Sequence, residues 1–407
     1  MAVVYHMGCN GVPARRRSYP EPAPFAERLV EKGIAPHLMG TLLIIAFLTH
    51  MKLLNFLKSK PAITALAIAV TITIINVHSS SSNPPIGKSI ITQSQSHIQL
   101  IHTLTAHKKV TFGVPAVVIS PDGQTLISGA RDDTIKIWNL RTGKLLHSID
   151  ANSDGVSSIA ISPDGKRIVS GGITTPTMKV WDLRTQLMLT LNIESGHTQP
   201  VETVAISSNG RLIASGSDDH TIKLWDLHTL KLLDTITAHS GYVSKVVFSP
   251  DMQTLVSAGG GDDNTIKLIS LQTKKIRHIL KGHKTAVDAI AITPDSKKLV
   301  TGSFGQLVSG NRAISTLKLW NLQTGKLLHE FTDNFSSVDS LVISPDGKIL
   351  ICGNFDGSIK LWSLETLKLL HTFQDGSSSV LGLALSPDGK TLASSNEDST
   401  IHIWQIN

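Results

Sequence analysis

The sequence predicts an all-β fold built from seven copies of a unit of about 44 residues, and three observations support that prediction. The tetrapeptide Ser-Pro-Asp-Gly, or a degenerate form of it, occurs at residues 120–123, 162–165, 207–210, 249–252, 293–296, 344–347 and 386–389. Each copy is followed by a segment that ends at Trp138, Trp181, Trp225, Ile269, Trp320, Trp362 or Trp404. Within a copy, apolar and polar residues alternate, which is the period of a half-buried strand.

The third copy shows how one unit forms four short antiparallel strands. Residues 201–206 alternate, and the sequence Ser208-Asn209-Gly210 then provides a turn. Further strands are expected at 212–215, 222–225 and 232–236. The turns have a physical basis, since proline fixes φ at the turn entrance in most copies and glycine adopts a positive φ without strain.

Residues 97–407 resemble a seven-bladed WD40 β-propeller. The resemblance rests on the repeat length, on the Gly-His pairs at 196–197 and 282–283, and on the Trp-Asp pairs at 181–182 and 225–226. It covers about three quarters of the chain, and the regular Ser-Pro-Asp-Gly copies are typical of bacterial members. The expected architecture is an all-β propeller with an apolar N-terminal helix outside it.

The resemblance also implies a hydrogen-bonded network inside each blade, made by a histidine, a strand serine or threonine, a turn aspartate and the tryptophan. Two copies carry the complete set: His107, Ser128, Asp132 and Trp138 in the first, and His197, Ser215, Asp219 and Trp225 in the third. A Ser-His-Asp set also occurs in hydrolases. Recurrence of the same residue types from copy to copy favours a structural role.

The other copies depart from this set. The fourth keeps the histidine, serine and aspartate but has Ile269 in place of tryptophan, and the fifth lacks the aspartate. The second, sixth and seventh have Asn152, Asn334 and Gly376 at the histidine position. Cys352 takes the serine position of the sixth copy, which predicts a buried small residue rather than a redox thiol.

The last copy ends after its third strand. Residues 99–104, Gln-Leu-Ile-His-Thr-Leu, match the fourth-strand sequence of an earlier copy, Leu-Leu-His-Thr-Phe at 369–373. We therefore expect the N-terminal strand to complete the last blade and so to remove the free edges of the ring.

The first hundred residues differ in composition from the rest. They carry nine Lys/Arg and three Asp/Glu, whereas residues 101–407 carry 29 and 28. We expect an unstructured or upstream extension at 1–50, a signal peptide or membrane-anchor helix at 51–78, a Ser/Pro-rich linker at 79–96 and the propeller at 97–407. The lysines before the apolar run at 62–77 would place the propeller outside the cytoplasm, and a cytoplasmic location is the alternative.

Composition and motifs exclude several classes of function. The near-neutral charge of residues 101–407 makes nucleic acid an unlikely partner, since phosphate binding needs a clustered basic surface. Two cysteines cannot form a disulfide framework or a four-cysteine zinc site. The sequence contains no His-Glu-x-x-His, P-loop or Gly-x-Ser-x-Gly motif. We therefore expect no catalytic residue, no metal and no cofactor.

Recognition is expected on the loops that precede the first strand or join the second to the third, which form the usual binding face by resemblance. Two of these loops are enlarged, at 108–112 and 304–315. Aromatic and arginine side chains are frequent anchors of protein interfaces. The candidates on this face are Phe112, Arg131, Tyr242, Phe304, Arg312, Phe335 and Phe355.

Two functions are compatible with these features. The first is a non-catalytic scaffold that binds proteins or peptides on this face and is anchored to a membrane or exported. The alternative is an enzyme or small-ligand receptor that uses the central channel. Small residues lining the channel would favour the scaffold, and convergent carboxylates or histidines would favour the receptor.

Overall fold

The computed structural model describes residues 98–105, 107–108, 113–151, 155–183, 187–190, 196–308, 312–314, 316–331, 336–376 and 378–406. The extension, anchor and linker expected at 1–50, 51–78 and 79–96 lie outside these ranges. Within the ranges, no helix is long and apolar enough to span a bilayer.

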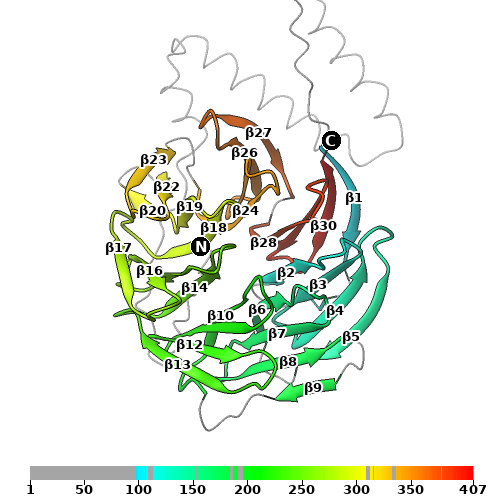
Figure 1. The fold of residues 1–407 in the computed structure, drawn as a ribbon. Helices are drawn as coiled ribbons and strands as arrows, with labels where there is room; N and C mark the ends of the chain where they lie inside the picture. Colours follow the sequence, from blue (N-terminus) through cyan, green and yellow to red (C-terminus); the bar gives the residue numbers. More distant parts are fainter. Residues whose placement is uncertain are drawn as a thin grey trace, which may run out of the picture. The chain divides into compact units, whose positions relative to one another are not determined.

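Seven four-stranded antiparallel sheets form the blades of a propeller (Figure 1). From the innermost strand outward, blades 1 to 7 are β2 (Ala116–Ile119), β3 (Thr125–Gly129), β4 (Thr134–Asn139), β5 (Leu145–Asp150); β6 (Val156–Ile161), β7 (Arg167–Gly172), β8 (Met178–Asp182), β9 (Leu187–Thr190); β10 (Val201–Ile206), β11 (Leu212–Ser217), β12 (Thr221–Asp226), β13 (Leu232–Thr237); β14 (Val243–Phe248), β15 (Thr254–Gly259), β16 (Ile266–Ser270), β17 (Ile276–Leu280); β18 (Val287–Ile292), β19 (Lys298–Ser303), β22 (Leu317–Asn321), β23 (Leu327–Phe331); β24 (Val338–Ile343), β25 (Ile349–Asn354), β26 (Ser358–Ser363), β27 (Leu369–Gln374); and β28 (Val380–Leu385), β29 (Thr391–Asn396), β30 (Ile401–Ile406), β1 (Ile98–Leu104).

The ring closes as the sequence predicts. The innermost strands of neighbouring blades contact one another around the centre, and β28 of blade 7 contacts β2 of blade 1 (Figure 1). The first strand of the propeller, β1, pairs antiparallel with the last, β30, with Leu100 opposite Trp404. The ring nitrogen Nε2 of His102 in β1 lies 2.9 Å from the Arg141 carbonyl of blade 1. The prediction that the N-terminal strand completes the last blade is confirmed.

The apolar cores lie between blades rather than within them. Trp225 of blade 3 packs with Val169 and Val180 of blade 2. Trp362 of blade 6 packs with Phe331 of blade 5, and the centres of the two rings are 5.2 Å apart. Each blade therefore buries its tryptophan against the preceding blade, as expected of stacked repeats that cannot bury an apolar face alone.

In blade 3 the residues of the expected network form one continuous chain of hydrogen bonds. Trp225 Nε1 can only donate, and it lies 3.0 Å from Ser215 Oγ. The serine hydroxyl therefore donates to His197 Nε2 at 2.7 Å, which leaves the proton on Nδ1 to be donated to Asp219 at 2.9 Å. Burial alone would raise the pKa of Asp219, but the hydrogen bonds from His197 and Thr221 hold it well below its usual range.

Blade 1 repeats this geometry. Trp138 Nε1 lies 2.9 Å from Ser128 Oγ, which is 2.7 Å from His107 Nε2. Nδ1 of His107 is 3.1 Å from the carboxylate of Asp132. In blade 3 the side chains of His197 and Asp219 are only 1% and 8% exposed. The histidine–aspartate pairs thus have almost no contact with solvent, and a substrate could not reach them.

Blade 7 has a rearranged network that the sequence comparison did not identify. Trp404 Nε1 donates to Ser394 Oγ at 2.9 Å, and that hydroxyl donates to Asp375 rather than to a histidine. His402 Nδ1 lies 2.9 Å from the same carboxylate, at the strand position that Lys223 has in blade 3. Burial would lower the pKa of His402, but its contact with Asp375 raises it above the usual value.

Blade 6 has an incomplete network. Cys352 pairs across the sheet as Ser215 does, and its thiol is fully buried, which raises its pKa. In the described part of the chain, Trp362 Nε1 finds no hydrogen-bond partner. Sulfur is a weak acceptor, so this blade depends on packing more than on hydrogen bonds.

We predict that Ser215→Ala lowers the free energy of unfolding by about 2–4 kcal/mol, because it leaves both Trp225 Nε1 and His197 Nε2 buried without a partner. Ser395 provides a matched control, since its hydroxyl is equally buried and has no hydrogen-bond partner. Ser395→Ala is expected to change stability by less than about 1 kcal/mol. Urea unfolding followed by tryptophan fluorescence measures both values, and equal losses would contradict the role given to the network.

Candidate functional site: the channel entrance

One face of the propeller is organised by a hydrogen bond that recurs in six blades. In each, the backbone N–H of a residue after the second strand donates to the carbonyl of a residue that precedes the first strand, over 2.8–3.2 Å. The donors are Arg131, Asp218, Gly260, Phe304, Phe355 and Glu397, and the acceptors are Gly113, Pro200, Tyr242, Ala286, Ser337 and Ser379. The acceptors lead into the innermost strands, so these loops surround one end of the channel. We call this region the channel entrance.

Four of the predicted recognition residues lie at this entrance. Arg131, Phe304 and Phe355 occupy the same donor position in blades 1, 5 and 6, and Tyr242 is the acceptor residue of blade 4. Phe355 is 49% exposed, which is unusual for a large apolar side chain. The ring of Tyr242 covers Gly260, where an added Cβ would come within 2.1 Å of the ring.

The other three candidates are not placed in this way. Phe112 and Phe335 lie outside the described residues. Arg312 is described only as part of the backbone of a strand. Whether these three contribute to recognition stays a prediction.

The enlarged loop of blade 5 forms a β-hairpin that sequence analysis did not resolve. Strand β20 (Gln306–Val308) pairs antiparallel with β21 (Arg312–Ile314), and within the described residues neither strand joins another sheet. Its base is fixed to blade 6, because Gly305 N–H donates to Ser337 Oγ at 2.7 Å. The alternation on both sides of Ser-Gly-Asn at 309–311 was the available signal for this hairpin.

Three carboxylates at the entrance were also missed. Glu202, Asp288 and Asp339 are each the second residue of an innermost strand, β10, β18 and β24. At the same position, Ser157 and Ser244 donate to the carbonyl of the first residue of the next blade, both over 2.5 Å. Side chains at this position therefore lie at the seam between neighbouring innermost strands. Alignment of the repeats already contained this information.

Asp339 is the most perturbed of the three. One carboxyl oxygen, Oδ2, is buried and has no hydrogen-bond partner. Burial and the nearby charge of Asp288 raise the pKa of Asp339 to about 8, although Lys245 acts in the opposite direction. Asp339 is thus largely protonated at neutral pH.

The acidic character of the entrance extends to blades 3 and 4. Burial raises the pKa of Tyr242, and the charges of Asp288, Glu202 and Asp218 raise it further. Asp288 thus acts on Tyr242 and on Asp339 alike. The entrance has a negative potential that would favour a cationic ligand.

The entrance has features of both functions considered for the channel. The second positions of the remaining innermost strands hold Pro115, Ser157, Ser244 and Leu381, of which three are small. The carboxylates converge on one side of this ring. Among the described residues, no three His, Cys, Asp or Glu side chains are arranged to hold a metal ion.

Comparison with protein families gives a match along the whole propeller. The model of the family described as WD domain, G-beta repeat matches residues 98–139, 143–182, 187–226, 230–270, 274–309, 325–363 and 367–405. The seven matched stretches correspond to the seven repeats.

The chain is also similar to short stretches of curated plant proteins. It is 33% identical over 76 residues to the small ribosomal subunit protein RACK1y of Oryza sativa subsp. japonica, covering 19% of this chain and 22% of that protein. For RACK1 of Brassica napus the values are 31% over 94 residues, 23% and 27%. The chain spans about a quarter of the length of these relatives. They are plant proteins and do not support the bacterial affinity suggested by the Ser-Pro-Asp-Gly copies.

We predict that Asp339→Asn stabilises the fold at neutral pH. The unfolded carboxyl loses its proton near pH 4, whereas the folded one keeps it to about pH 8, so the stability of the wild type falls as pH rises between these values. The variant lacks this loss and should gain up to about 4 kcal/mol at pH 7 relative to wild type, and almost nothing at pH 3.5.

Urea unfolding at several pH values measures this difference. Asp346→Asn is the control, because the Ser344 hydroxyl lowers the pKa of that exposed carboxyl, and the substitution should therefore destabilise the fold at neutral pH. A stability difference for Asp339→Asn that does not vary with pH would contradict the prediction.

Proposed function

The chain belongs to the WD40 repeat family, and from that premise we propose that it is a protein-interaction scaffold whose channel entrance binds a basic segment of a partner protein. The single observation that carries the proposal is the convergence of Glu202, Asp288 and Asp339 at equivalent positions of three innermost strands. Partner charge is the property that such a surface selects most directly.

The surroundings of these carboxylates support a protein partner. The half-exposed ring of Phe355 offers an apolar contact beside the acidic region. The hairpin β20–β21 is joined at its base to blades 5 and 6 and presents strand edges. Apolar anchors beside complementary charges are the usual composition of a protein interface.

A second candidate is a receptor for a small organic cation in the channel. The observation that favours it is the buried Oδ2 of Asp339, which no described group satisfies. A small amine would compete with a basic peptide for this oxygen. Competition by ethylammonium at concentrations too low to act as general salt would support the receptor.

We predict that a fluorescein-labelled oligo-arginine peptide binds the full chain and that Asp288→Asn/Asp339→Asn weakens binding at least tenfold, because two carboxylates lose their charge. The matched control is Asp346→Asn/Asp388→Asn, which removes the same charge from exposed turns at the opposite end of the innermost strands. It should change affinity less than about twofold. Fluorescence anisotropy measures both.

The same measurement has a pH dependence that tests the role of Asp339. A cation favours the ionised carboxylate, so affinity should rise from pH 6 to pH 8.5 as Asp339 loses its proton. Asp339→Asn should remove this rise. Equal losses in the entrance variant and in the control would show general charge attraction and contradict the proposed site.

We also propose that residues 51–78 hold the propeller at a membrane or direct its export. The proposal rests on the lysines that precede the apolar run at 62–77. We predict that the full chain sediments with membranes, or is released from the cell, and that deletion of 62–77 leaves it in the soluble intracellular fraction. Fractionation of both forms measures this, and a full chain found in the cytosol would contradict it.

A further inference from the structure

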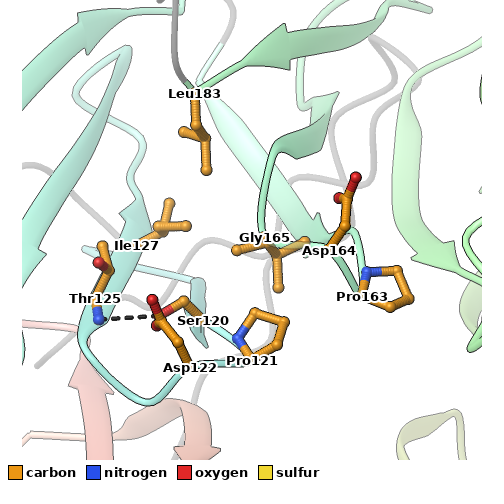
Figure 2. Close-up of a pocket in the computed structure, with 10 residues that line it drawn as sticks. Ser120, Pro121, Asp122, Thr125, Ile127, Pro163, Asp164, Gly165 and Leu183 are labelled. Atoms are coloured by element: carbon orange, nitrogen blue, oxygen red, sulfur yellow. Dashed lines mark hydrogen bonds between the residues drawn. The ribbon is translucent and has the colours of Figure 1, made fainter.

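A cavity opens on the face opposite the entrance, at the seam between blades 1 and 2. Its volume is about 350 Å³. The Ser-Pro-Asp-Gly turns of both blades line it, and Leu183 closes one side (Figure 2). The lining residues are Ser120, Pro121, Asp122, Thr125, Ile127, Ile161, Pro163, Asp164, Gly165 and Leu183.

Equivalent seams elsewhere in the ring are crossed by a basic side chain. In blade 2, Arg167 Nη1 donates to the carbonyl of Leu227 in blade 3 at 2.5 Å. In blade 5, Lys298 Nζ donates to the carbonyl of Leu364 in blade 6 at 3.3 Å. Both basic residues begin the second strand of their blade. The propeller therefore places a cation at this seam twice, each time on a leucine carbonyl.

The seam between blades 1 and 2 has the same acceptor but no such donor. Leu183 corresponds to Leu227, because in each the backbone N–H bonds to the carbonyl at the second-strand turn of the same blade, at Lys166 and Arg211 respectively. The residue of blade 1 that corresponds to Arg167 is Thr125. Its side chain is too short to cross the seam, which explains why the cavity is open here.

The walls of the cavity suit a long basic side chain. Asp122 and Asp164 carry negative charge at neutral pH, since hydrogen bonds from Ser120 and Ser162 lower the pKa of each carboxyl. Lys166 approaches Asp164 only to 4.0 Å, and both side chains are more than half exposed, so the pair is weak.

The remaining walls are apolar. Pro121 and Pro163 come from the two turns, and Ile127 and Ile161 from strands β3 and β6 (Figure 2). An arginine has an apolar stem of three methylene groups and a planar cationic end with five donors. The stem matches the apolar walls, and the cationic end matches the carboxylates and the leucine carbonyl.

We propose that this cavity is a second binding site and that it receives an arginine side chain of a partner protein, with the guanidinium in the position that Arg167 takes one seam further along. The volume lies at the lower end of the range for ligand sites, about 300–1,000 Å³, and is adequate for one side chain. The site is separate from the channel entrance, so it stands or fails independently of the proposed function.

The test uses a capped peptide with one arginine between glycine and serine residues, and the same peptide with citrulline. Citrulline has almost the same shape without the charge. Ligand-observed NMR on the full chain should show binding of the arginine peptide and at least tenfold weaker binding of the citrulline peptide. Free arginine, whose own carboxylate would face Asp122 and Asp164, should bind more weakly than the peptide. Equal binding of free arginine would indicate a metabolite site and overturn the assignment to a partner protein.

The decisive variant is Thr125→Arg, which supplies the missing side chain from blade 1. It should abolish binding of the arginine peptide and raise the thermal unfolding midpoint. Thr391→Arg, the same substitution at the equivalent position of blade 7, should leave binding unchanged, and so should Thr125→Val. Asp122→Asn/Asp164→Asn keeps the shape of the cavity and should weaken binding at least tenfold.

The proposal is overturned if the peptide binds Thr125→Arg as well as wild type, if citrulline equals arginine, or if neither peptide binds. Should Thr125→Arg fail to fold, the carboxylate double variant decides the question alone. The entrance variant Asp288→Asn/Asp339→Asn should bind the single-arginine peptide as wild type does. Loss of binding in that variant would place the peptide at the entrance and refute this site.

Discussion

Closure of the ring is the constraint on which the rest of this structure depends. Each blade buries its tryptophan against the blade before it, so an open array of seven would leave one apolar face in water. Pairing of β1 with β30 removes that face and joins the start of the propeller to its end. The contact of His102 with the Arg141 carbonyl continues this join into blade 1. Every loop on either face is consequently held on a rigid frame, which is the condition for a preformed binding surface.

Because the blades are equivalent, each position has six internal references, and a departure from them shows where the chain does something different. A serine at the second position of an innermost strand donates to the next blade, whereas an aspartate at that position leaves an oxygen without a partner. A basic residue at the start of the second strand fills a seam, whereas Thr125 leaves a cavity. Both departures lie where neighbouring blades meet, and both leave acceptors that a cation could satisfy.

The sequence was sufficient for the fold because the fold is periodic. Seven copies, four strands in each and closure by residues 99–104 all follow from repeated text, and the structure has them. What the sequence did not show depends on distances between copies. Asp375 and His402 are 27 residues apart and meet only because β30 folds back beside the turn of its own blade. Asp288 and Asp339 belong to different blades, and their interaction requires the curvature of the ring. The hairpin at β20–β21 was assigned to an enlarged loop because its strands have three residues each.

Charge distribution explains how a nearly neutral propeller can still select cationic partners. Residues 101–407 carry 29 basic and 28 acidic residues, so the long-range field is weak and attraction to a polyanion is not expected. Locally the balance differs, since burial and mutual repulsion make the carboxylates of the entrance unstable as anions, and Asp339 keeps a proton at neutral pH. A cation that enters displaces this proton and relieves the repulsion, so part of the binding free energy comes from removing an unfavourable interaction within the free protein. Such a site discriminates by charge at short range, where shape also matters, rather than by attraction at a distance.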